Sequence, residues 1–118
     1  MSYVKRLVDQ SSLTQAQLES LLLYSRVLSG DLTLNEAAKL RTNGPVSVGA
    51  YQRVVKQGLN NLQQAMITIL LGTKMRLLKG EELKKLVELV DKSPNELPEE
   101  QEEVFVTLLY ALVKKIVM

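Results

Sequence analysis

The residues best suited to chemistry form one group of small and polar side chains near the middle of the chain. Its members are Ser47, Gly49, Ala50, Gln52, Arg53, Lys56 and Gln57. Arginine suits the edge of guanine and glutamine that of adenine, while small residues let a helix backbone approach a DNA groove. A serine hydroxyl and the first amides of a helix can hold a phosphate. These residue types predict hydrogen bonding to double-stranded DNA.

Helical periodicity places this group mainly on one side of a predicted helix. At 100° per residue, Arg53 and Gln57 lie at the centre of the outward face. No acid occurs between Glu36 and Glu81, although this stretch carries seven Lys or Arg. An ordinary solvated surface, which is the alternative interpretation, would usually contain some acid. The side chains expected to be buried on the opposite face are Tyr51, Val55, Leu59 and Leu62.

The rest of the sequence argues against an enzyme. The chain has no histidine and no cysteine, so the commonest general base and thiolate zinc ligands are absent. The glycine spacing at 44–49 is that of a phosphate loop, but Ala50 and Tyr51 replace the required Lys-Ser/Thr. The acids at 99–103 suit the dipole of a helix start better than a metal site. We therefore predict no enzymatic activity, no metal, no cofactor and no small-molecule substrate.

Charge is unevenly distributed along the chain. Residues 1–79 hold ten Lys or Arg and four Asp or Glu, whereas residues 80–118 hold five and nine. This asymmetry indicates a basic part that contacts polyanions and an acidic part that does not. No signal peptide or membrane span is recognisable, so we expect a cytoplasmic protein without membrane contact.

Capping chemistry and periodicity predict an all-α fold. Thr14 with Gln17, and Thr33 with Glu36, have the spacing of capping boxes. Ser47 is the expected N-cap of a long third helix. The expected helices cover residues 15–28, 35–41, 48–71, 81–92 and 99–118, with a brief one at 4–9.

Two glycines carry further expectations. Gly58 interrupts the third helix, which indicates a close approach to another element, and Gly72 is expected to end it. Residues 1–72 are predicted to be the DNA-binding part. Residues 73–118 are predicted to be a C-terminal helical part for dimerisation or partner binding, in one compact domain.

The order of a longer helix, a very short helix, a turn and a capped helix is that of a helix-turn-helix. The runs at 13–19, 33–38 and 47–54 resemble the opening, scaffold and recognition segments of sigma-factor region four and related regulators. The resemblance covers about Leu13 to Gly58 and implies a stand-alone regulator. It implies DNA-facing roles for Ser47, Gly49, Ala50, Gln52, Arg53 and Lys56. Between Glu36 and Ser47 the chain is longer than the tight turn of that family.

Two functions remain open. The first is a sequence-specific or architectural double-stranded DNA-binding protein, a transcriptional regulator with a recognition helix in the major groove. Further phosphate contacts are then expected from Lys5, Arg6, Lys39 and Arg41. The second is a helical protein–protein interaction module, an adaptor or antitoxin-like partner, without direct DNA binding.

A homodimer is expected because two-fold symmetry suits paired half-sites. The far end of the third helix is also apolar nearly all round, with Met66, Ile67, Ile69, Leu70 and Leu71.

Overall fold

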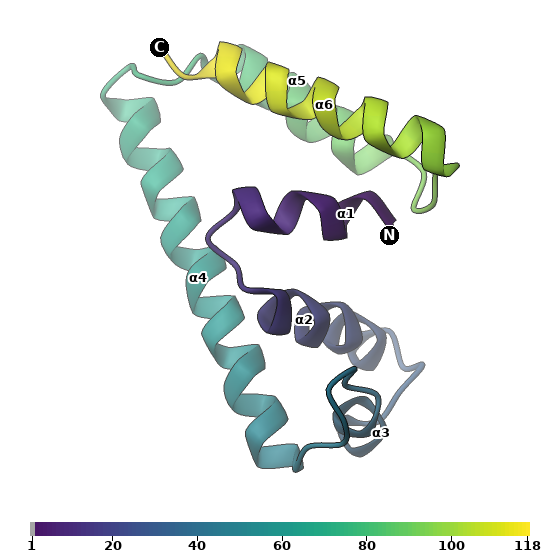
Figure 1. The fold of residues 1–118 in the computed structure, drawn as a ribbon. Helices are drawn as coiled ribbons and strands as arrows, with labels where there is room; N and C mark the ends of the chain where they lie inside the picture. Colours follow the sequence, from purple (N-terminus) through teal and green to yellow (C-terminus); the bar gives the residue numbers. More distant parts are fainter. Residues whose placement is uncertain (1) are drawn as a thin grey trace. The chain divides into compact units, whose positions relative to one another are not determined.

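The computed structural model describes residues 2–118. Within them the protein has six α-helices, one short 3-10 helix and no β-strand, which confirms the all-α prediction (Figure 1). The elements are α1 Ser2–Leu7, η1 Val8–Gln10, α2 Gln15–Leu28, α3 Leu34–Lys39, α4 Val48–Lys74, α5 Gly80–Lys92 and α6 Glu99–Ile116.

Contacts divide the chain into two compact units. Unit 2 is Val8–Gln64, and unit 1 joins residues 2–7 to Ala65–Met118. This division falls inside α4, before the boundary expected at residue 72, and it places α1 with the C-terminal helices. The reason is that α1 buries its Tyr3 within unit 1.

Unit 2 has a core built from three helices. Its buried members are Ala37 and Ala38 of α3 with Tyr51 and Val55 of α4, and side chains of α2 pack against them. The Tyr51 ring is fully buried. Its hydroxyl donates a 2.9 Å hydrogen bond to the Ser20 carbonyl of α2. This bond and the surrounding apolar contacts fix how α4 is rotated about its axis.

The helix starts in unit 2 follow the sequence expectations. Both capping boxes form, at Thr14 with Gln17 and at Thr33 with Glu36. Helix α2 ends in a Schellman motif, with Gly30 in the left-handed region at φ 87°. There the Asp31 amide donates to the carbonyl of residue 26. The predicted ends of α2 are therefore confirmed.

Helix α4 does not end at Gly72 as expected but continues to Lys74. Gly72 instead admits a neighbour, because a Cβ there would lie 2.9 Å from Leu78 Cδ1. The helix ends in a second Schellman motif, in which the Leu77 amide donates to the Gly72 carbonyl at 2.9 Å. Arg76, with φ 60°, takes the left-handed position that glycine usually occupies.

The close approach predicted at Gly58 is confirmed. A Cβ at this position would lie 2.8 Å from Leu21 Cδ1 of α2. The predicted burial of Leu59 and Leu62 is wrong, since these side chains are 38% and 46% exposed. Because α2 crosses α4 at the glycine, the line through Tyr51, Val55 and Gly58 is buried and the neighbouring leucines lie beside it.

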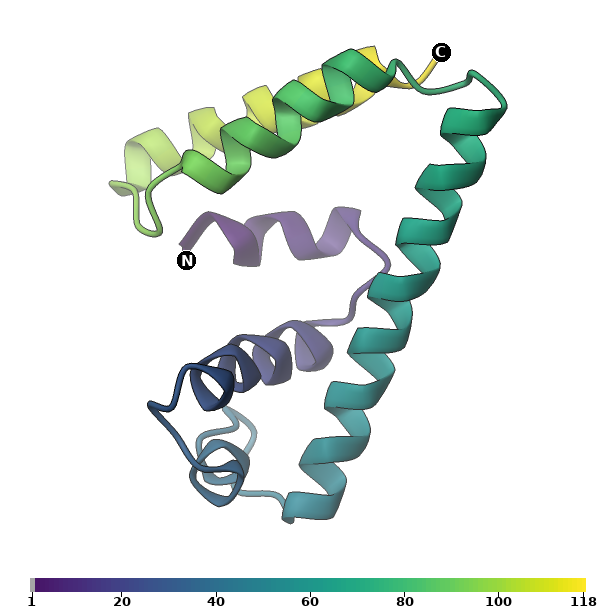
Figure 2. The same cartoon turned by 180° about the vertical axis from the view of Figure 1, so that it is seen from behind.

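In unit 1, α5 and α6 pack side by side, as both ribbon views show (Figure 2). The Tyr3 ring of α1 and the Phe105 ring of α6 form a T-shaped pair, with centroids 5.0 Å apart. The Tyr3 hydroxyl hydrogen-bonds Ser93 Oγ at 2.7 Å. Arg6 Nε donates to Glu102 Oε1 at 2.6 Å. These contacts hold α1 on the C-terminal helices.

The end of the chain is tied to the segment before α5. Leu78 and Val117 form an isolated antiparallel bridge. The Lys79 amide donates to the Ile116 carbonyl, and the Met118 amide donates to the Leu77 carbonyl, both at 2.9 Å. Across residues 2–118, no helix has the length and apolar character needed to cross a membrane.

The buried Tyr51 bond can be tested by removing one oxygen. Tyr51→Phe is expected to lower the free energy of unfolding by about 1 kcal/mol, because the ring stays and only the hydrogen bond is lost. Urea unfolding followed by circular dichroism measures this change. Ser20→Ala is the matched control, because it keeps the accepting carbonyl and removes a buried Oγ that has no partner among the described residues. Equal stability of Tyr51→Phe and wild type would contradict this role.

Candidate nucleic-acid interface

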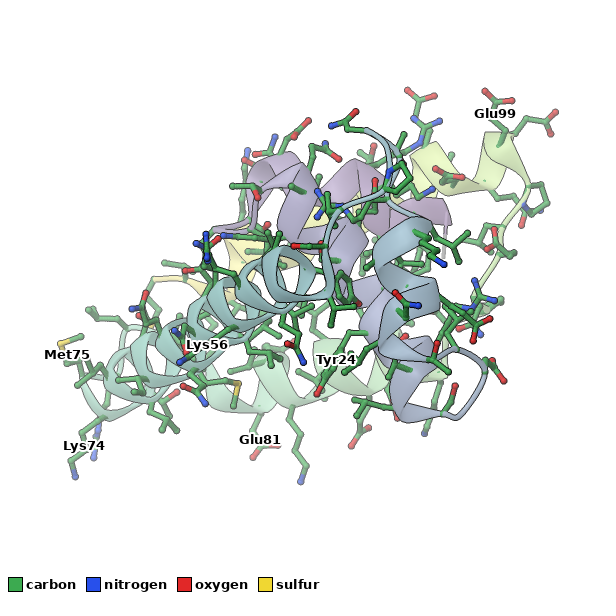
Figure 3. All side chains as sticks on the ribbon, turned by 90° about the horizontal axis from the view of Figure 1, so that it is seen from below. Tyr24, Lys56, Lys74, Met75, Glu81 and Glu99 are labelled. Carbon is green, nitrogen blue, oxygen red and sulfur yellow. The ribbon has the colours of Figure 1, made fainter. Side chains whose placement is uncertain are left out.

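All seven predicted site residues lie at the start of α4, within unit 2. The exposed members are Ser47, Gly49, Gln52, Arg53, Lys56 and Gln57, while Ala50 is half-buried. Figure 3 shows Lys56 on α4 and Tyr24 on α2, the helix that supports the inner side of α4. The structure thus brings the long polar side chains together on one outward surface. We call this surface, from Ser47 to Gln57, the α4 polar face.

Ser47 caps α4, as predicted. Its Oγ accepts a hydrogen bond of 3.1 Å from the Ala50 amide. This is the N-cap geometry, in which a serine oxygen satisfies one of the unpaired amides of the first turn. The Ser47 hydroxyl is still able to donate a hydrogen bond to a phosphate oxygen.

Gly49 leaves the backbone of the first turn open. Among residues 2–118, apart from its chain neighbours and the nearby backbone of α4, no atom lies within 4 Å of the position where its Cβ would be. The glycine is therefore not required by a close contact at this position. A bare backbone at an exposed helix start is suited to close approach by a ligand.

The connection between α3 and α4 is longer than a helix-turn-helix turn. It covers residues 40–47, whereas such a turn usually has three or four residues. The Val46 amide donates to the Ala38 carbonyl at 3.1 Å, which draws the chain back toward α3. Gly44, at φ 102°, supplies the left-handed turn. The extra length is therefore folded into an ordered loop.

Glu19 of α2 holds this loop. Its Oε1 accepts from Arg41 Nε at 3.0 Å and from the Thr42 amide at 2.7 Å. Burial raises the pKa of this carboxyl, but hydrogen bonds from Thr42 and Arg41 outweigh burial and bring the pKa below its ordinary value. Glu19 holds the loop that leads into the candidate site, and the sequence did not predict this because nothing local links it to residues 41 and 42.

Two of the expected phosphate contacts are already engaged within the chain. The Arg41 side chain is only 10% exposed and pairs with Glu19. Arg6 pairs with Glu102 in unit 1. The Arg41 guanidinium is thus occupied in holding the loop, and its contact with DNA stays a prediction. Lys39 remains exposed in unit 2.

Residues 2–118 contain no group of His, Cys, Asp or Glu that could hold a metal ion. No family model, curated protein or solved structure matches this chain. The likeness to helix-turn-helix regulators therefore stays a prediction from the sequence.

The Glu19 contacts predict a specific dependence of stability on pH. Since folding lowers the Glu19 pKa, its contribution is complete above the ordinary value of 4.5 and is lost as pH falls through the lower folded value. Glu19→Gln is expected to destabilise the protein at pH 7. It is also expected to reduce the loss of folding stability as the pH falls. Urea unfolding at a series of pH values measures both effects.

Glu36→Gln is the control for this experiment. The Glu36 pKa is also lowered, by hydrogen bonds from Thr33, but its capping contact is remote from the loop. This variant should still show the decrease in folding stability at low pH that is caused by protonation of Glu19. If wild type and Glu19→Gln lose stability in parallel below pH 5, the role given to Glu19 is wrong.

Proposed function

We propose that this protein binds double-stranded DNA through the α4 polar face and acts as a transcriptional regulator. The observation that carries the proposal is the exposure of Gln52, Arg53, Lys56 and Gln57 on one face of α4, a helix that contains no acidic residue. Small residues precede them at the start of the helix, where the backbone can approach the major groove.

The spacing of these side chains gives each a role. Arg53 and Gln57 are four residues apart and lie one above the other on the helix. In the proposed complex they read base edges, Arg53 at guanine and Gln57 at adenine. Gln52 and Lys56 form a second such pair that contacts bases or the backbone. The Ser47 hydroxyl and the first amides of α4 meet a phosphate.

The interior of unit 2 supports such a role for the helix. A recognition helix must present the same face each time, so its rotation has to be fixed. Tyr51 anchors α4 to Ser20 of α2, and Glu19 fixes the loop that leads into it. Both contacts lie within unit 2, and Tyr51 is on the side of α4 away from Arg53.

The α4 polar face can be tested by charge reversal. Arg53→Glu is expected to weaken binding to mixed-sequence duplex DNA at least about fivefold, since one good arginine–guanine pair contributes about 1–3 kcal/mol. Fluorescence anisotropy titration at low salt measures the affinity. Arg26→Glu is the matched control, because Arg26 is also exposed in unit 2 but belongs to α2. Undetectable binding by wild type, or equal loss in both variants, would refute the assignment.

A second candidate function is a helical protein-interaction module. An open, mainly apolar groove of about 540 Å³ in unit 1 favours it. The lining residues include Leu89, Leu97, Val104, Phe105 and Leu108. A groove of this kind suits the apolar face of a partner helix. Salt separates the two functions, because phosphate binding weakens steeply as salt rises and apolar docking does not.

A further inference from the structure

The mainly apolar groove of unit 1 lies beside the turn that joins α5 to α6. Its lining on α6 runs from Glu100 to Leu108, a length of about 12 Å along the helix axis. Leu89 of α5 and Leu97 of the connection also line it. On α6, Val104 and Leu108 are 68% and 48% exposed. We call this cavity the α5–α6 groove, and its length matches about two turns of a partner helix.

The α5–α6 groove lies in a strongly acidic part of the chain. Residues 88–103 hold seven Asp or Glu and one Lys. Glu100 lines the groove, Glu103 lies about 60° further round α6, and both are exposed. Lys92 also lines the groove, but it follows Glu88 by one helical turn, so this acid offsets its charge. A partner in the groove therefore meets apolar side chains bordered by negative charge.

Unit 1 already holds one basic helix beside this groove. Helix α1 carries two cations and no acid. Its Tyr3 contacts the Phe105 ring and the Ser93 hydroxyl, and both of these residues line the groove. Its Arg6 donates to Glu102, which is buried. The surface of α6 thus binds α1 by combining an apolar contact with an acid that accepts a cation.

Glu100 repeats the position of Glu102 on the other edge of the groove. At 100° per residue, Phe105 lies about 140° from Glu100, and Glu102 lies about 60° beyond Phe105. The α6 lining of the groove therefore has an acid on each side. Arg6 already engages Glu102, whereas Glu100 is exposed at the first turn of α6. A second basic helix can be received on the Glu100 side.

We propose that the α5–α6 groove binds the apolar face of a basic amphipathic helix from a partner protein, with its Lys or Arg side chains against Glu100 and Glu103. This proposal rests on the protein-interaction function and specifies the partner that it needs. The groove lies outside the α4 polar face and its binding is measured without DNA. DNA binding can therefore fail without affecting this proposal.

Two synthetic amphipathic helices of equal length serve as probes. One carries leucine on its apolar face and lysine on its polar face, and the other carries leucine and glutamate. In anisotropy titrations with the full chain, the leucine–lysine peptide is expected to bind at least about fivefold more tightly, because the exposed acids attract one peptide and repel the other. Equal affinities would overturn the basic partner alone. Binding of neither peptide would also overturn the protein-interaction function.

Charge reversal at the edge of the groove tests the position of the partner. Glu100→Lys is expected to shift the preference at least about fivefold toward the leucine–glutamate peptide. Glu81→Lys is the matched control, because Glu81 is equally an exposed acid in the first turn of its helix but lies outside the groove lining. Equal shifts in the two variants would mean that net charge alone attracts the peptide, and would overturn the proposal.

An uncharged substitution tests the apolar contact. Val104→Ser is expected to weaken the leucine–lysine peptide at least about fivefold, since it removes a valine that the partner covers. Val87→Ser is the control, because Val87 is also exposed, at 59%, and lies on α5 outside the groove lining. Both valines face solvent, so circular dichroism should show unchanged folding. Equal affinity of the two variants would overturn binding in the groove.

Discussion

The fully buried Tyr51 determines what the rest of unit 2 can present to its surroundings. Burying an aromatic ring removes about 150–250 Å² from water, roughly 4–6 kcal/mol at 25 cal/mol per Å². This is several times the contribution of its single hydrogen bond to Ser20. Apolar burial therefore drives Tyr51 inward, and the hydrogen bond selects one position for it. Once this residue points inward, the neighbouring Gln52 and Arg53 must point away from the core.

The cost of Gly58 fits the same arrangement. Glycine within a helix costs about 1 kcal/mol relative to alanine. In return, α2 can bring Leu21 to a distance that no Cβ would permit. This close crossing places the helices together beside Tyr51 and Val55, so the core is small but well defined. It also displaces Leu59 and Leu62 from the interface, which explains why simple periodicity overestimates their burial.

Local features of this fold could be predicted from the sequence, and non-local ones could not. The capping boxes at Thr14 and Thr33 and the cap at Ser47 involve residues three positions apart, so their spacing is sufficient. The pairing of Glu19 with residues 41 and 42 depends on where α2 meets a loop. The same limit applies to Arg6 and Glu102, which are far apart in sequence. The outward position of Arg53 could be predicted, because two residues after the buried Tyr51 lies on the opposite side of a helix.

The two engaged arginines change what the charge distribution implies. Residues 1–79 carry a net charge of +6 by composition, but Arg6 and Arg41 are already paired with acids. Outside α2, the exposed cations of unit 2 are Lys39, Arg53 and Lys56. With Arg53 assigned to a base edge, two phosphate contacts remain, which would give a salt slope of only about −2, so base contacts must supply much of the affinity of the proposed complex.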